Sequence, residues 1–61
     1  MNEIIDYARP AMLAEIALKD MHNAVIEKRY DAAKEDALEA LVQVKLAYYA
    51  ICVEQENVRK A

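Results

Sequence analysis

Glycine, tryptophan and phenylalanine are absent from this 61-residue chain, which has one proline, one cysteine and one histidine. Without glycine, the tight turns of β-hairpins and the loops that hold phosphates or dinucleotides lack their usual residue. One cysteine forms no internal disulfide, and one cysteine with one histidine is too few for a zinc site within one chain. Of the usual supports for a domain this short, oligomerisation or a binding partner remains.

The chain has little excess of either charge, since eight basic and eleven acidic residues leave a net charge of −3. This mildly acidic balance argues against nucleic acid or an anionic membrane as a general partner. Charged residues such as Lys19 and Lys45 keep every apolar run below the roughly 18 residues of a membrane span. Glu3 and Asp6 stand where a signal peptide would carry basic residues. We therefore expect a cytoplasmic protein that does not enter a membrane.

Residues with high helix propensity dominate, which predicts an all-α fold. The predicted break lies at residues 28–31, with Asp31 as the N-cap of the second helix. Helix one is predicted at about residues 3–28, with a kink or a start near Pro10, and helix two at about 32–59. Because glycine is missing, we expect Arg29 or Tyr30 to adopt the unfavourable turn conformation. Two helices joined by a short turn predict one antiparallel helical-hairpin domain over residues 1–61.

Helix two is apolar over well over half of its circumference, as judged from residues spaced three and four apart. One row contains Ala37, Leu41, Val44, Tyr48 and Ile51, and a second contains Leu38, Val42, Leu46, Tyr49 and Val53. We expect the first row to pack on a seam of helix one made of Ile4, Tyr7, Ala11, Ala14, Leu18, Met21 and Val25, widened by Leu13, Ala17 and Ala24. The narrow polar face, expected to be solvated, contains Asp36, Glu39, Gln43, Glu54 and Asn57, with Ala47 and Ala50 between them.

One partner helix covers only about a third of this circumference, so the second row is predicted to contact another molecule. Ile5, Met12 and Ile16, on the far side of helix one, would extend that contact. Together with the second row they would complete a homodimeric four-helix bundle. The alternative interpretation of these three residues is that they are scattered exposed hydrophobic side chains, which are normal on any surface.

Few residues suggest chemistry. Glu35, Asp36 and Glu39 are clustered, but we favour a solvated helix start over metal binding or acid–base catalysis, because no Glu-x-x-His pair accompanies them. Cys52 has no base near it in the sequence and is expected to be a small buried hydrophobic residue. We therefore predict that the protein is not an enzyme, and we assign no catalytic, metal or cofactor residues.

The basic residues Lys28, Arg29 and Lys34 gather at the predicted turn. They are candidates for a nucleic-acid contact, although a solvated turn is the favoured interpretation because lysines near a helix C-terminus are stabilised by the helix dipole.

The stretch AMLAEIALKDMHNAVIEKRYDAAKEDALEALVQVKLAYYAI, with the short length and glycine-free composition, resembles the short accessory proteins of lambdoid temperate phages. In length and plan the chain is also similar to the plasmid copy-number regulator Rop, a short helical hairpin that dimerises, although no motif is shared. The first resemblance implies a regulatory protein that binds a host or phage protein, and the second a nucleic-acid-binding regulator. We expect a non-enzymatic homo-oligomeric interaction module of the first kind, with a Rop-like regulator as the alternative.

Overall fold

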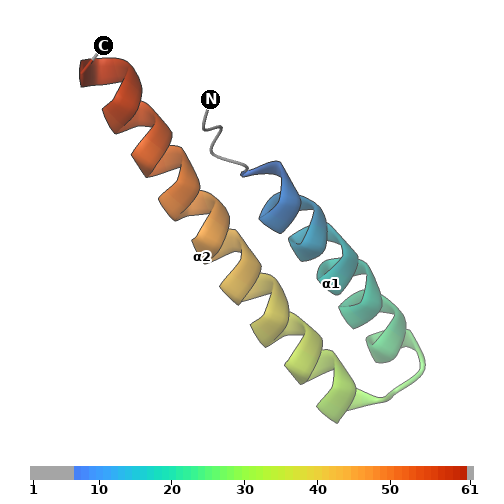
Figure 1. The fold of residues 1–61 in the computed structure, drawn as a ribbon. Coiled ribbons are helices and arrows are strands. Elements are labelled where there is room, and N and C mark those ends of the chain that lie inside the picture. Colours follow the sequence, from blue (N-terminus) through green and yellow to red (C-terminus); the bar gives the residue numbers. More distant parts are fainter. Residues whose placement is uncertain (1–6, 61) are drawn as a thin grey trace.

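Two α-helices pack against each other in an antiparallel hairpin, which confirms the predicted all-α fold (Figure 1). This computed structural model describes residues 7–60, and side-chain burial for residues 7–59. Helix α1 comprises Ala8–Ile26 and helix α2 comprises Tyr30–Lys60, and no strand is present among the described residues.

The single proline lies in the first turn of α1. The helix begins at Ala8, so Pro10 is its third residue, and the Ala11 N–H donates to the Tyr7 carbonyl over 3.1 Å. In a first turn the N–H that proline lacks would have no partner within the helix, so proline costs little there. The predicted helical segment at residues 3–6 lies outside the described residues.

The turn is built around Lys28, which has a φ of 62°. The Arg29 N–H donates to the Ala24 carbonyl over 2.8 Å, and the Lys28 N–H donates to the Val25 carbonyl over 3.0 Å. This pair of bonds is the Schellman motif, in which the residue beyond the helix adopts the left-handed conformation that glycine favours. The prediction that Arg29 or Tyr30 would adopt this conformation was wrong, because α2 begins directly at Tyr30 and leaves that role to Lys28.

Helix α2 begins earlier than predicted. The Arg29 carbonyl accepts a hydrogen bond from the Ala33 N–H over 3.0 Å, which makes Arg29 the N-cap residue. Asp31, predicted as the N-cap, lies inside the first turn. Its carboxylate remains favourable there, because the exposed N–H groups of a helix start attract negative charge.

Alanine lines the surface where the helices meet. The six buried side chains of the described region are Ala14, Ala17 and Ala24 of α1 and Ala33, Ala40 and Ala47 of α2. Half-buried residues continue the same spacing of three and four, namely Pro10, Met21, Asp36, Gln43 and Ala50. We call these buried and half-buried residues the seam. Small side chains on both helices allow their backbones to approach closely.

The predicted orientation of helix two was wrong. Leu41, Val44, Tyr48 and Ile51, expected to pack on helix one, are 50–64% exposed. The face expected to be solvated supplies the seam instead, with Asp36, Gln43, Ala47 and Ala50 all buried or half-buried. The reason is that alanines recur every seven residues on α2 and match alanines of α1. Alanines of both helices therefore form the buried part of the contact, and Met21, Asp36 and Gln43 lie half-buried between them.

Helix one is oriented closer to the prediction. Ala14 and Met21 lie in the seam, and Ala11 is half-buried beside it. Tyr7, Leu18 and Val25, predicted for the seam, are 45–54% exposed. Ala17 and Ala24, predicted at its edge, are buried instead. The contact is therefore shifted toward the side of α1 that carries these two small residues.

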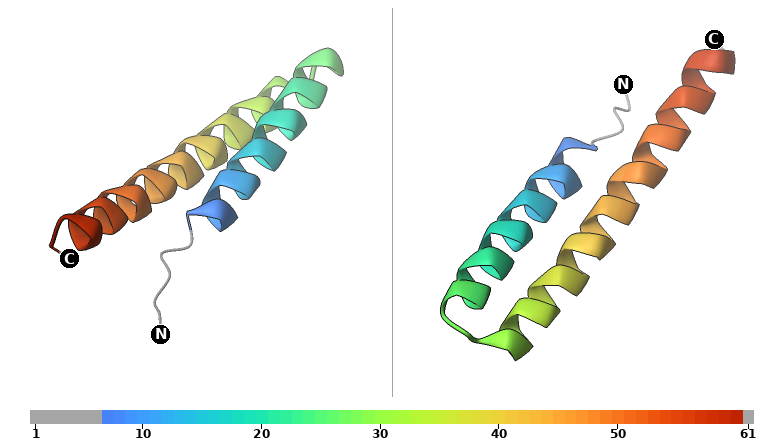
Figure 2. Two further views of the ribbon diagram at one scale, coloured as in Figure 1. Left: turned by 90° about the horizontal axis from the view of Figure 1, so that it is seen from above. Right: turned by 180° about the vertical axis from the view of Figure 1, so that it is seen from behind.

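The hairpin is long and thin, with extents of 50 × 15 × 11 Å, and α2 extends past the start of α1 (Figure 2). Its radius of gyration is 14.8 Å, whereas a compact domain of this length has about 10.5 Å. Its accessible surface is 4978 Å², whereas a compact monomer of this mass has about 4,000 Å². The hairpin therefore leaves exposed a surface that a globular domain of its size would bury.

Replacing Lys28 tests the strain in the turn. Lys28→Gly removes the Cβ that disfavours a positive φ, so we expect the free energy of unfolding to rise by about 1 kcal/mol relative to Lys28→Ala. Both variants lose the lysine side chain, which makes alanine the matched control. Urea denaturation followed by circular dichroism at one protein concentration measures the difference. Equal stability of the two variants would contradict the left-handed conformation at residue 28.

A second pair of variants tests the orientation of α2. Ala40→Leu places a large side chain in the seam, so we expect the free energy of unfolding to fall by about 1–3 kcal/mol. Ala37→Leu makes the same change at an exposed position and is expected to be neutral or stabilising. Thermal denaturation at matched concentration compares them. If Ala37→Leu were the more destabilising of the two, the orientation of helix two predicted from the sequence would be correct.

Candidate interaction surface

Large apolar side chains point outward from the hairpin instead of into it. Eighteen of them are at least 39% exposed, and Met21 is the remaining one among the described residues and is half-buried. Single exposed hydrophobic residues are ordinary, but contiguous apolar patches mark interaction sites. The arrangement of these residues along the two helices therefore decides what the surface can bind.

One side of the hairpin presents mostly apolar residues. Residues that directly follow a seam position lie on one flank of each helix, and antiparallel packing brings these two flanks to the same side. The members of this flank that lie nearest the seam are all uncharged: Ala11, Leu18, Val25, Ala37, Val44 and Ile51. Farther from the seam, at equivalent helical positions, lie Leu41 and Tyr48 together with Glu15, His22 and Lys34. We call the six residues nearest the seam, with Leu41 and Tyr48, the uncharged face.

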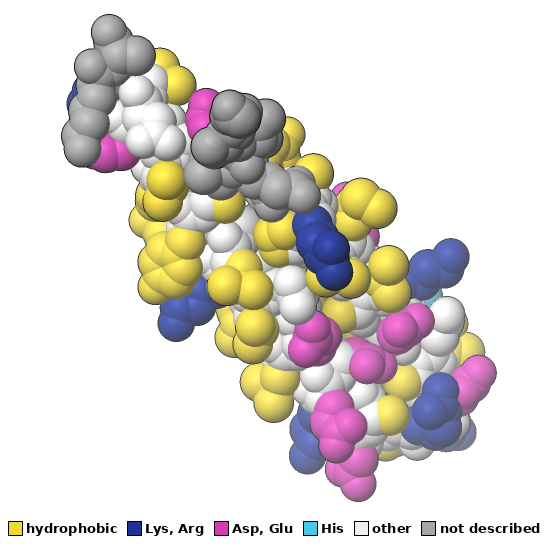
Figure 3. Space-filling model, in the orientation of Figure 1, with side chains coloured by type: hydrophobic (Ala, Val, Ile, Leu, Met, Phe, Trp, Pro, Cys, Tyr) yellow, Lys and Arg dark blue, Asp and Glu magenta, His cyan; other side chains and the backbone are white. Residues whose placement is uncertain are grey.

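The opposite side combines apolar and acidic residues. Residues that directly precede a seam position form this flank, and their neighbours on the outer positions extend it. We call the set the mixed face: Leu13, Ile16, Asp20 and Glu27 of α1, with Glu35, Glu39, Val42, Leu46, Tyr49 and Val53 of α2. Figure 3 shows a side with this pattern, where hydrophobic side chains gather along α2 and acidic ones over the half nearer the turn.

The structure brings together most of the residues predicted for the oligomer contact. Ile16, Val42, Leu46, Tyr49 and Val53 share the mixed face. Leu38 and Met12 are exposed by 63% and 61%, on the outer sides of their helices away from the seam. Ile5 lies outside the described residues. The prediction that this set contacts another molecule stays a prediction, and the uncharged face is a second candidate because its large apolar side chains are 45–64% exposed.

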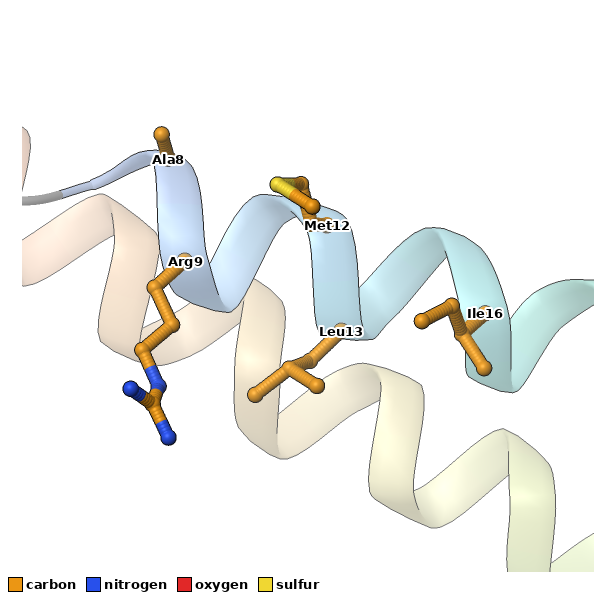
Figure 4. Close-up of a pocket in the computed structure, with 5 residues that line it drawn as sticks. All are labelled: Ala8, Arg9, Met12, Leu13 and Ile16. Atoms are coloured by element: carbon orange, nitrogen blue, oxygen red, sulfur yellow. The ribbon is translucent and has the colours of Figure 1, made fainter.

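A shallow depression of about 390 Å³ lies along the start of α1. Ala8, Arg9, Met12, Leu13 and Ile16 line it, and Figure 4 shows that these side chains all come from α1. It is open and largely apolar, so it extends the mixed face toward the outer side of α1. Nothing in its lining resembles a catalytic arrangement.

Tyr48 and Tyr49 divide between the two faces, because adjacent helical residues point about 100° apart. Their ring centroids are 5.8 Å apart with the planes tilted by 59°. A side-chain hydrogen bond with Cys52 raises the pKa of the Tyr48 phenol, and electrostatic interaction with that cysteine and slight desolvation act in the same direction. Cys52 itself is exposed, so the prediction that it is buried was wrong.

The basic residues at the turn lie next to acidic ones. Arg29 Nε is 2.8 Å from Glu27 Oε1, and Lys34 Nζ is 3.8 Å from Asp31 Oδ1. Exposed pairs of this kind contribute little to stability. They do offset the positive charge that Lys28, Arg29 and Lys34 were predicted to present to a phosphate backbone.

The acidic cluster of Glu35, Asp36 and Glu39 is divided by the fold. Asp36 is half-buried in the seam, which contradicts its predicted solvated position. Glu39 accepts a hydrogen bond from Gln43 Nε2 over 2.7 Å. Within residues 7–60, no three histidine, cysteine or acidic side chains are grouped so that they could bind a metal ion.

Neither α1 nor α2 is long and apolar enough to cross a membrane. Comparison of the chain with protein-family models, with curated proteins and with solved structures finds no match. The two faces of the hairpin are therefore the basis on which a function is inferred.

The uncharged face was not predicted as an outer surface, and Leu13, predicted at the edge of the helix-one seam, is 39% exposed on the mixed face. The signal was present in the spacing of small residues. Ala33, Ala40 and Ala47 recur every seven residues, as do Ala17 and Ala24. A seven-residue repeat of alanine on two antiparallel helices predicts close packing through those residues. Judged by this repeat, the alanines are the best candidates for the contact between the helices. Judged by hydrophobicity alone, the larger side chains would be.

Proposed function

We propose that this protein is a non-enzymatic interaction module that works as a homodimer, in which two hairpins form a four-helix bundle that binds another protein. The observation that supports it is the inverted use of apolar residues. Alanines fill the contact within the hairpin, and large apolar side chains face outward.

The energetics favour a second copy. A buried methyl group contributes about 0.8 kcal/mol, whereas full burial of a valine, leucine or isoleucine side chain contributes about 1.5–3 kcal/mol. Packing in the seam therefore buries few of the large apolar side chains and gains only a small part of the stabilisation that their full burial would give. Helices in small proteins are stabilised mainly by packing of their apolar faces. A partner that covers an outer face would bury these large side chains and add the stabilisation that the alanine contact does not provide.

The partner beyond the dimer is proposed to be a host or phage protein in the cytoplasm. The resemblance to short accessory proteins of lambdoid phages supports this class. The mixed face supports a segment that combines apolar with basic residues, because Leu46 and Val53 lie on the same side as Asp20 and Glu39. The protein would regulate that partner by binding it, without chemistry of its own.

Sedimentation equilibrium over a concentration series tests self-association. We expect twice the chain mass of 7.0 kDa at micromolar concentration, with helicity that falls on dilution as the dimer dissociates. A monomer that melts cooperatively and keeps its helicity at high dilution would contradict the proposal, because it would show that the outer faces need no cover.

A Rop-like nucleic-acid regulator is the second candidate, supported by the exposed basic residues at the turn. The neighbouring Glu27 and Asp31 carboxylates weaken it. A gel-shift series with duplex DNA and structured RNA at increasing salt separates the two functions. We expect no retardation at physiological salt. Binding that falls steeply with salt, and that is lost in Lys28→Gln with Lys34→Gln, would favour the second candidate.

A further inference from the structure

We infer that the second copy of the chain covers the uncharged face, and that the mixed face stays outside the dimer. This inference rests on the proposed function and adds which surface the two copies share. The contact would run along Leu18, Val44 and Ile51 of each copy, with Leu41 and Tyr48 toward its edge.

Charge distinguishes the two faces. A two-fold interface places the same surface of each copy against the other. The six residues nearest the seam on this flank carry no charge, so two such flanks meet along their centre without like charges. Glu15, His22 and Lys34 share the outer rows with Leu41 and Tyr48, and Glu15 and Lys34 carry opposite charges.

The mixed face is poorly suited to meet a copy of itself. It carries four carboxylates, from Asp20, Glu27, Glu35 and Glu39, in the half nearer the turn. Arg29 pairs with Glu27, and Arg9 lies beside the far end of this face. The other three carboxylates would lose water in a contact between two such faces, and burying a charge without an opposite charge opposes association.

One broad side of the hairpin has the size of a stable dimer contact. The two larger extents of the hairpin, 50 and 15 Å, multiply to about 750 Å² for the outline of that whole side, of which the uncharged face is part. A specific interface of standard size buries about 800 Å² on each partner. A second copy on this side would cover most of the roughly 1,000 Å² by which the accessible surface of 4978 Å² exceeds that of a compact monomer.

Tyr48 suits the edge of this interface. It is 62% exposed in the hairpin, and its hydroxyl group lies beside Cys52 on the outer side of α2. Tyrosine is common at protein interfaces because its ring buries apolar surface while its hydroxyl keeps a polar partner. The ring of Tyr48 would pack against the second copy, and the hydroxyl would stay at the boundary with water.

Val44 and Leu46 provide a matched test, because both are 50% exposed and they lie on opposite faces of the same helix. Val44→Glu would bury a carboxylate in the proposed contact. We expect it to raise the dimer dissociation constant by about 100-fold or more. Leu46→Glu adds the same charge to the mixed face and is expected to change that constant by less than about threefold. Sedimentation equilibrium of the wild type and both variants measures these constants.

Each outcome decides the inference. Dissociation caused by Leu46→Glu alone would move the dimer contact to the mixed face and overturn the inference, while leaving the proposed function intact. Equal effects of the two variants, large or small, would also overturn it. A monomeric wild type would instead overturn the proposed function, and the inference with it.

A second measurement avoids the risk that a buried glutamate prevents folding. In a Cys52→Ser background, Val44→Cys and Leu46→Cys place one thiol on each face with little change in size. The rate of alkylation by iodoacetamide is then compared at high and low protein concentration. We expect Val44→Cys to react at least about 10-fold more slowly in the concentrated dimer, and Leu46→Cys to react at the same rate in both. The opposite pattern, or equal rates for the two variants, would contradict the proposed contact.

Discussion

Close contact between two stripes of alanine is the constraint on which the rest of this structure depends. An alanine side chain ends at Cβ, so helices that meet through alanines can approach closely. Nearly all larger apolar side chains of the described residues lie on the flanks, and Met21 is half-buried in the seam. The antiparallel arrangement brings Ala24 toward Ala33 and Ala17 toward Ala40 across the three-residue connection between α1 and α2. Lys28 adopts a positive φ in this connection, as the Schellman motif requires.

The same constraint produces two flanks of similar apolar content and different charge. Val44 and Leu46 are equally exposed, yet one has apolar neighbours along the hairpin and the other shares its side with several carboxylates. Hydrophobicity alone does not distinguish these surfaces, whereas the cost of bringing like charges together does. The proposed division of roles rests on this difference: one flank would pair with a copy of itself, and the other would remain for a partner with different charge.

Much of the fold was predictable from local features. High helix propensity, the absence of glycine, and a single break near residues 28–31 predicted two helices and their connection. Pro10 predicted either a start or a kink of helix one nearby, and in the structure it lies in the first turn of α1. The surplus of apolar residues on helix two was also visible in its periodicity. The contact residues were predicted less well. Leu41 and Tyr48 were assigned to the interior, and Gln43 and Ala47 to the solvent, which the structure reverses.

The sequence by itself determined that the chain is helical, that it folds back once, and that its two rods carry more apolar surface than they can cover. These properties depend on each residue and its near neighbours. Only the tertiary structure decided how each helix is rotated about its axis. That rotation depends on whether Ala33, Ala40 and Ala47 find matching small residues on a helix distant in sequence. Packing between matched small residues outweighs the hydrophobicity of any single side chain. This match depends on both helices together, so it cannot be read from either helix alone.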